Sequence, residues 1–386
     1  MPTKRITYID ALRGFTMILV IVNHVSAYCF GVPYTLNDLE NGCYSFTAFF
    51  REFRMPLFFF ISGFVLYKAT VVWNWKHIVA FFKKKIPVQL LSPFLFFAAY
   101  MFLFGKDFKE SIYHPYKIGY WFTYTLLEFY ILYAVVRYVL YKLKARSFLT
   151  DVCLTGWGFL VMLLAWYVLK KQPLYNLLGT ETWQYFIYFV LGTLTRKHFP
   201  HFEQMLDKGP IVVLAVLSFL GFNIFYRQLP PHFLYHIPTL HVVDFLLAVS
   251  GIIIVFSFFR KHLNTNQTDK ETVSLTEESI SDIQKFRAAP LQFIGRRTLD
   301  IYLLHYFFIP RQLAEAFPFF HDHAMPVLEM AGSLIISAVV IAACLIVGSV
   351  LRLNPNMAHH LFGASLPTST KGSPSFLADK ETGSKQ

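Results

Sequence analysis

The apolar stretch LRGFTMILVIVNH, from Leu12 to His24, carries an arginine near its start and ends on a histidine. In an α-helix Arg13 and His24 lie almost three whole turns apart, so both side chains point along one face about 16 Å from each other. Asp10 precedes Arg13 by three positions and shares that face. Histidine can remove a proton near neutral pH, and arginine can stabilise a developing negative charge. This face is therefore a candidate for acid–base chemistry.

A purely structural interpretation of the same face remains open. Arg13 would extend its guanidinium to a membrane interface, and His24 would pack as an ordinary buried histidine. The energetic cost favours function, because an arginine at the centre of a bilayer is unfavourable by roughly 2.5 kcal/mol or more.

Three further polar residues interrupt apolar segments. In FREFRMPLFFFISGF, Arg54 comes just before Pro56, which kinks or breaks a helix. In YWFTYTLLEFYILY, Glu128 is a carboxylate that needs a partner such as Arg54 or Arg13, and its role is either catalytic or that of a structural ion pair. In GRRTLDIYLLHYFF, His305 is a second imidazole inside an apolar segment. Arg54, Glu128 and His305 join Asp10, Arg13 and His24 as catalytic candidates.

The composition indicates that these residues lie in a membrane. Of the 386 residues, 55% are hydrophobic and only 15% are charged, against about 25% charged in an ordinary soluble domain. Long apolar runs without two-residue alternation predict helices and not a β-barrel. We expect an all-α, polytopic membrane protein of about ten transmembrane helices. The expected spans are 6–29, 47–68, 86–104, 119–140, 148–169, 183–194, 210–226, 241–259, 291–309 and 327–351.

Lysine and arginine set the expected orientation. With a cytoplasmic N-terminus, runs such as 83–85, 142–146 and 296–297 fall on the inner side, as the positive-inside rule requires. The C-terminus is then also cytoplasmic. This asymmetry accounts for the formal charge of +12, so we expect no nucleic-acid partner. The spacing of the cysteines predicts no metal site.

The membrane domain is expected to cover residues 1–362. It includes a polar cytoplasmic loop at 262–290, and the segment 363–386, rich in Ser, Thr, Lys, Pro and Gly, is expected to form a disordered tail.

Four motifs together carry a family resemblance. They are YIDALRGFTMILVIVNH, FRMPLFFFISGF, the pair Trp121-Phe122 followed by a glutamate, and IGRRTLDIYLLH. In this order they resemble the membrane-bound acyltransferase-3 family of bacteria, and the spacing of Arg13 and His24 is the most specific element. The family often carries Arg-x-x-Arg at the inner end of the third span. This sequence differs, since it has Lys83, Lys84 and Lys85 followed by Gln89.

The resemblance implies acyl transfer, usually acetyl, from cytoplasmic acyl-CoA to a hydroxyl of a cell-envelope glycan. It implies a multi-pass protein of the inner membrane, with Arg13 and His24 in the active site and acyl-CoA as a co-substrate. The chemistry is compatible, because histidine can activate a sugar hydroxyl or carry the acyl group transiently. Cations at the inner ends of the spans could bind the phosphates of coenzyme A, or could be positive-inside anchors only. These cations are Lys83, Lys84, Lys85, Arg296 and Arg297.

Two other functions fit a polytopic protein with buried charges. One is a transporter or flippase of a lipid-linked sugar or a small organic anion, for which matching halves with broken helices would be expected. The polar residues instead concentrate in the first two spans. The other is a noncatalytic membrane sensor, for which a soluble signalling module would be expected, and the sequence shows none.

Overall fold

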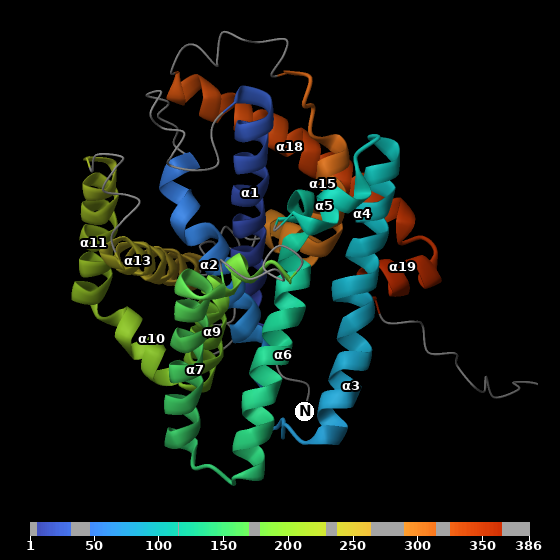
Figure 1. Ribbon diagram of the computed structural model, residues 1–386. Helices are drawn as coiled ribbons and strands as arrows, with labels where there is room; N and C mark the ends of the chain where they lie inside the picture. The colour runs from blue at the N-terminus through green and yellow to red at the C-terminus, as the bar shows by residue number, and fades with distance from the viewer. Residues whose placement is uncertain are drawn as a thin grey trace, which may run out of the picture.

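The computed structural model is a bundle of helices (Figure 1) and describes residues 6–31, 47–114, 116–169, 178–228, 238–263, 289–313 and 325–364. Most of the expected loop at 262–290 and of the expected tail at 363–386 lies outside these residues. The helices are α1 (Thr7–Phe30), α2 (Thr47–Leu66), α3 (Trp75–Ile86), η2 (Pro87–Leu91), α4 (Ser92–Leu103), α5 (Phe108–Tyr113), η3 (Lys117–Gly119), α6 (Trp121–Lys142), α7 (Ser147–Tyr167), η5 (Thr180–Tyr185), α9 (Phe186–Lys197), α10 (Phe199–Asp207), α11 (Gly209–Gln228), α13 (Pro238–Leu263), α15 (Thr298–Phe308), α18 (Pro326–Leu351) and α19 (Pro355–Phe362).

The all-α prediction is confirmed, and the described part of each expected span is mainly helical. Within the described residues, six helices are long and apolar enough to cross a membrane, or seven if the bent pair Phe199–Asp207 and Gly209–Ile224 forms one span. The expected count of about ten is therefore not confirmed. One of the six is continuous from Trp75 to Leu103, through α3, a π-helical turn at η2 and α4, and begins well before the expected start at residue 86.

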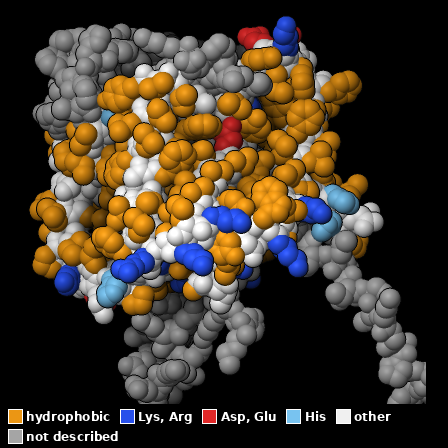
Figure 2. All heavy atoms as spheres, turned by 60° about the horizontal axis from the view of Figure 1, so that its bottom comes forward, with side chains coloured by type: hydrophobic (Ala, Val, Ile, Leu, Met, Phe, Trp, Pro, Cys, Tyr) orange, Lys and Arg blue, Asp and Glu red, His pale blue; other side chains and the backbone are white. Residues whose placement is uncertain are grey.

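The outer surface of the bundle is suited to lipid. Large hydrophobic side chains are exposed along many helices, including Phe102 at 87% and Ile335 at 67%, which would be a severe liability in water. Figure 2 shows this apolar surface, with Lys and Arg side chains arranged in a row along its lower part. The last turns of α6, α9 and α13 all carry basic residues. The chain is therefore a multi-pass membrane protein.

The interior is built from aromatic side chains and close backbone contacts. α1 contacts α2, α13, α15 and α18, which places it inside the bundle (Figure 1). α2 packs on α9 so closely that a Cβ at Gly63 would lie 1.9 Å from the carbonyl oxygen of Phe189, and one at Gly192 would lie 2.0 Å from that of Phe60. Such small-residue contacts are the usual way in which membrane helices approach each other. They fix α2, which continues through Pro56 without a break.

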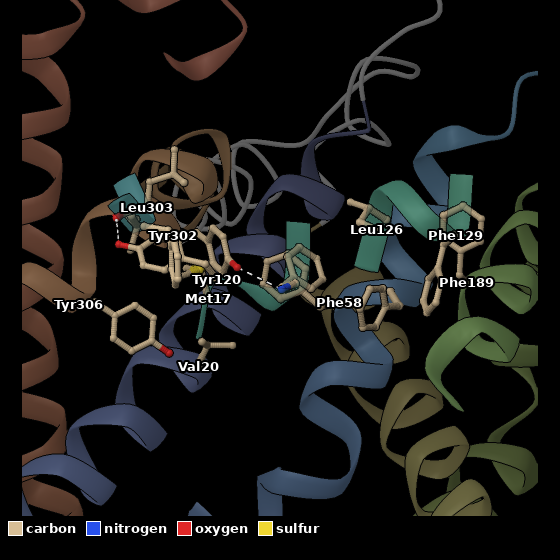
Figure 3. Close-up of a cluster of buried hydrophobic side chains, with 14 of the residues drawn as sticks. Met17, Val20, Phe58, Tyr120, Leu126, Phe129, Phe189, Tyr302, Leu303 and Tyr306 are labelled. Carbon is tan, nitrogen blue, oxygen red and sulfur yellow. Dashed lines mark hydrogen bonds between the residues drawn. The ribbon is translucent and has the colours of Figure 1, made fainter. Parts of the chain in front are cut away.

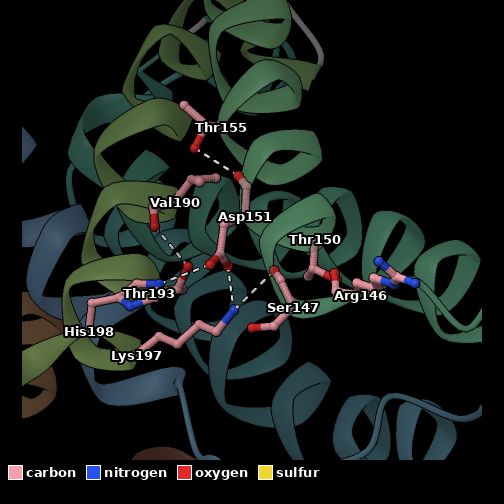
Figure 4. Close-up of polar contacts among 9 residues, drawn as sticks. All are labelled: Arg146, Ser147, Thr150, Asp151, Thr155, Val190, Thr193, Lys197 and His198. Atoms are coloured by element: carbon pink, nitrogen blue, oxygen red, sulfur yellow. Dashed lines mark hydrogen bonds and ion pairs between the residues drawn. The ribbon is translucent and has the colours of Figure 1, made fainter.

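Ion pairs stabilise the polar ends of several helices. Asp151 of α7 accepts from Lys197 at 2.6 Å and forms a 2.9 Å contact with His198, which joins α7 to the end of α9 (Figure 4). Asp300 of α15 is 1% exposed and accepts two bonds from Arg352, at 2.6 and 2.7 Å, as well as a 3.1 Å bond from Arg297. This second cluster ties α15 to the end of α18.

Replacing Asp300 by asparagine should therefore destabilise the protein. The change leaves two half-buried guanidinium groups without their counter-charge, at a cost of about 3 kcal/mol. We expect a clearly lower unfolding temperature in detergent, followed by tryptophan fluorescence. Asp207→Asn is the matched control, because Asp207 pairs with Arg260 but its side chain is 63% exposed, so its loss should change stability little. Equal unfolding temperatures for the two variants would contradict the prediction.

Candidate active site

His24 of α1 contacts α15, the helix that carries the second predicted histidine. The Nε2 atom of His24 lies 3.0 Å from the hydroxyl of Tyr306. The ring of His24 also stacks on that of His305, with centroids 5.3 Å apart and 27° between the planes. Residues distant in sequence thus meet in one cluster, and the structure brings both predicted histidines together.

The hydrogen bonds of His305 define its tautomer. Its Nδ1 atom lies 2.8 Å from the carbonyl oxygen of Tyr302 and 3.1 Å from that of Ile301. A carbonyl can only accept, so Nδ1 carries a proton, and in the neutral imidazole Nε2 then carries the lone pair. Nε2 is buried and has no hydrogen-bond partner among the residues that the structure describes. His305 is fully buried behind His24.

A cavity of about 590 Å³ opens on His24. On α1 it extends along Met17, Val20, His24 and Tyr28, whose ends are eleven positions or about 16 Å of helix apart. Its polar lining comprises His24, Arg51, Glu52, Arg54, His114, Gln184 and Asp244, and its aromatic lining comprises Tyr28, Phe58, Tyr116, Trp121, Phe122, Trp166, Tyr185, Tyr188, Tyr302 and Tyr306. The described part of the chain contains no cluster of three or more His, Cys, Asp or Glu residues that could hold a metal ion.

The motif IGRRTLDIYLLH fixes α15 against α1. A Cβ at Gly295 would lie 1.8 Å from the carbonyl oxygen of Asp10, and one at Gly14 would lie 2.0 Å from that of Leu291. Only glycine permits this backbone approach at both positions. Arg296 adds an ion pair, with its Nε 3.9 Å from Asp10. The predicted site residues Asp10 and Arg296 therefore lie at this helix contact, whereas Arg297 donates to Asp300.

A short loop before α6 attaches to α15 at the level of the histidines. The hydroxyl of Tyr302 donates to the carbonyl oxygen of Gly119 at 3.0 Å and accepts from the amide of Phe122 at 3.1 Å. The hydroxyl of Tyr120 donates to the carbonyl oxygen of Leu303 at 2.9 Å (Figure 3). These bonds hold one wall of the cavity on α15.

The predicted arginines occupy different positions. Arg54 lines the cavity, whereas Arg13 is half-buried and is not among the lining residues. Arg13 precedes Met17 by one helical turn, and Met17 is the lining residue of α1 closest to the N-terminus. Arg13 therefore lies just beyond one end of the cavity, on the helix face that also carries His24.

Glu128 has a different partner from the predicted arginines. Its Oε2 atom accepts from the indole nitrogen of Trp183 at 2.8 Å, and it does not line the cavity. This bond joins α6 to η5.

The predicted donor-binding lysines lie at the end of α3. Lys83 and Lys84 are exposed, whereas the ammonium of Lys85 lies over the rings of Phe81 and Tyr130, at 5.8 and 5.1 Å from the centroids. The π-helical turn at η2 follows directly and contains Gln89, which is 9% exposed. Such turns occur frequently at functional sites.

Sequence reasoning missed three residues near His24. Tyr306 contacts its ring nitrogen, Tyr302 holds the adjoining loop, and Arg311 follows α15, with its guanidinium over Tyr28 at 4.3 Å from the ring centroid. The tyrosines give no sequence signal among 22 in the chain, and Arg311 resembles an ordinary basic residue after a span. These three residues could be recognised only once the structure showed which helices pack against each other.

The fold and this site define a polytopic helical membrane protein with a histidine pair at an internal cavity. A family model described as an acyltransferase domain, acyltransferase-3, matches residues 6–351. The chain belongs to this family, which confirms the resemblance seen in the motifs, and it is an acyltransferase.

Curated relatives agree with this assignment at low identity. Glucans biosynthesis protein C of Escherichia coli strain K12 is 22% identical over 344 residues, which cover 79% of this chain and 82% of the relative. The protein of the same name from strain SMS-3-5 / SECEC is 22% identical over 342 residues, with the same shares covered. No solved structure matches the chain.

The contact between Glu128 and Trp183 predicts different effects for two substitutions. Glu128→Gln retains an oxygen that accepts from the indole, so acyl transfer by purified protein should stay within about threefold of native, a loss below 1 kcal/mol. Glu128→Leu leaves the indole donor unpaired, which should lower the free energy of unfolding by about 1–3 kcal/mol. A catalytic carboxylate would give the opposite pattern, with Glu128→Gln inactive but stable.

Proposed function

We propose that the protein transfers an acyl group, most simply acetyl, from cytoplasmic acyl-CoA to a hydroxyl of a cell-envelope glycan, within the inner membrane of a bacterium. The single observation that carries this proposal is the contact of His24 with Tyr306 at a cavity that also contains Arg54. A base beside a cation is what attack of an alcohol on a thioester requires.

In the proposed reaction His24 removes the proton of the acceptor hydroxyl. The hydroxyl oxygen forms a bond to the thioester carbon, and the carbonyl oxygen gains negative charge, which Arg54 stabilises. The carbon–sulfur bond then breaks, and the thiolate of coenzyme A takes the proton from the imidazolium. In the alternative order, His24 attacks the thioester carbon first, and the carbon–sulfur bond breaks as the thiolate of coenzyme A leaves. The alcohol oxygen then takes the acyl group from His24, and its proton goes to the thiolate.

The cavity lining supports a carbohydrate acceptor. Aromatic faces such as Trp121 and Tyr185 can pack on sugar rings. Arg51, Glu52 and Asp244, which also line it, can bond to hydroxyls. The name of the relatives, glucans biosynthesis protein C, concerns a glucan in those proteins, and it favours a polysaccharide as the acceptor of this chain as well.

The basic end of the bundle suits the donor. Coenzyme A carries several phosphate charges, and Lys83 and Lys84 are exposed beside the π-helical turn. Arg296 is 52% exposed and close to Asp10, so it can contact a phosphate. Arg13 lies between this end and the cavity, where it can position the thioester.

His24→Ala should abolish acyl transfer and leave expression and membrane insertion normal, because the variant lacks the proposed base. Membranes supplied with labelled acetyl-CoA would be assayed for label in the glycan fraction. The mass of surface glycans with and without the gene would identify the acyl group.

The matched control is His198→Ala, which removes an imidazole that is 49% exposed and bound to Asp151. It should transfer label as the native protein does. Transfer by His24→Ala would refute the role of His24, and uptake of a sugar conjugate without any transfer would favour a transporter.

Replacing Lys83 and Lys84 by alanine should raise the KM for acyl-CoA about tenfold, with kcat nearly unchanged, since only ground-state attraction to phosphate is lost. The effect should shrink in high salt, because exposed charges are screened. Lys142→Ala with Lys144→Ala removes two charges at the end of α6 as a control. An equal KM in both double variants would indicate that Lys83 and Lys84 are anchors only.

A further inference from the structure

Gly119 touches the tyrosine that contacts His24. A Cβ at Gly119 would lie 1.8 Å from the hydroxyl oxygen of Tyr306 and 2.0 Å from its Cζ atom. Those distances are far inside van der Waals contact, so any side chain at position 119 would displace the Tyr306 ring. The same hydroxyl lies 3.0 Å from Nε2 of His24. Displacing the ring would therefore remove the contact with the histidine.

The backbone around Gly119 is held in an unfavourable conformation. Lys117 has a φ of +42°, Ile118 of +50° and Gly119 of +94°. Left-handed φ values are rare for residues with a side chain, especially for a β-branched one such as Ile118. Such a conformation persists only when the surroundings impose it, and it is frequent at functional sites.

α15 contributes to the surroundings that hold this conformation. Tyr302 donates to the carbonyl oxygen of Gly119 at 3.0 Å, and Tyr120 donates to that of Leu303 at 2.9 Å. The loop is thus bonded to the helix that carries Tyr306. Ile118 and Gly119 also line the cavity. The same loop therefore forms part of the cavity wall and contacts Tyr306.

From this geometry we infer that Gly119 is a positioning residue that acts through Tyr306 to hold the imidazole of His24. The phenol hydroxyl engages one ring nitrogen, and this bond restricts both the rotation of the ring and its tautomer. Gly119 supplies the space in which the phenol must lie. The inference rests on the proposed function, in which His24 is the base.

The test compares four variants of the full chain. Gly119→Ala introduces the Cβ, Tyr306→Phe removes the hydroxyl, and the double variant combines the two changes. Gly105→Ala is the matched control, because Gly105 also has a positive φ, +58°, but a Cβ there would meet nothing within 4 Å. It also places a side chain at a positive φ, but displaces no ring.

Two measurements distinguish positioning from general destabilisation. The first is kcat and KM for labelled acyl transfer as a function of pH. The second does not depend on activity: it is the rate at which diethyl pyrocarbonate modifies His24, followed by mass spectrometry of the peptide. An imidazole nitrogen held in a hydrogen bond reacts slowly, so loss of the bond should speed modification.

We expect Gly119→Ala and Tyr306→Phe each to lower kcat about tenfold, the size of one lost hydrogen bond, with little change in KM. The double variant should lose no more than either single variant, because both changes remove the same contact. The pH of half-maximal kcat should shift equally in the two single variants. Both should speed modification of His24, whereas Gly105→Ala should match the native protein.

The inference is overturned if the losses in kcat multiply in the double variant, or if Gly119→Ala resembles Gly105→Ala in the modification rate. A native protein that transfers no acyl group would refute the proposed function instead. In that case the modification rates alone still decide whether Gly119 holds Tyr306 on His24.

Discussion

The crossing of α1 with the segment that ends in α15 is the constraint on which the site depends. At one end the two backbones touch, because Gly14 and Gly295 have no side chains to separate them. At the other end Tyr306 contacts His24. A helix is stiff over this distance, so a contact at each end fixes the height and the rotation of α1. The imidazole is therefore placed by the backbone as well as by its own hydrogen bond.

A lipid environment explains why polar groups occur in such specific pairs. A polar atom inside the bilayer cannot bond to water, so it must find a partner within the protein. Ser26 of α1 donates to Glu329 of α18, and Trp183 donates to Glu128. Each pair joins two helices that apolar contacts alone would leave free to slide, since lipid tails compete equally for apolar surfaces. The carboxylates thus contribute to the register of the bundle.

The sequence predicted features that belong to a single helix, such as its position and the residues on one face. It did not predict contacts between two helices. The 3.6-residue period put Asp10, Arg13 and His24 on one face, and the apolar runs located α1 and α18 closely. The partner of Glu128 was not predictable, because an indole 55 positions away carries no charge that would mark it. Tyr306 was overlooked for the same reason. The short α15 and α9 lack the length that identifies a span, so the number of crossings also needs more than hydropathy.

The proposed donor and acceptor would bind near opposite ends of the α1 segment between Arg13 and His24. The cost of desolvating each substrate indicates which part of them crosses this distance. Under the proposed function the donor carries phosphates, which are costly to take into a medium of low dielectric, and the acceptor carries many hydroxyls, which are also costly to desolvate. The acyl thioester and its arm are the least polar part of either substrate. Moving the acyl thioester and its arm from Arg13 past Met17 to His24 costs less free energy than moving the phosphates in the same direction, or the sugar toward Arg13. Under the proposed function we therefore expect the base at the cavity, where His24 lies, and the donor-binding cations beyond the other end of the cavity, on the side of Arg13.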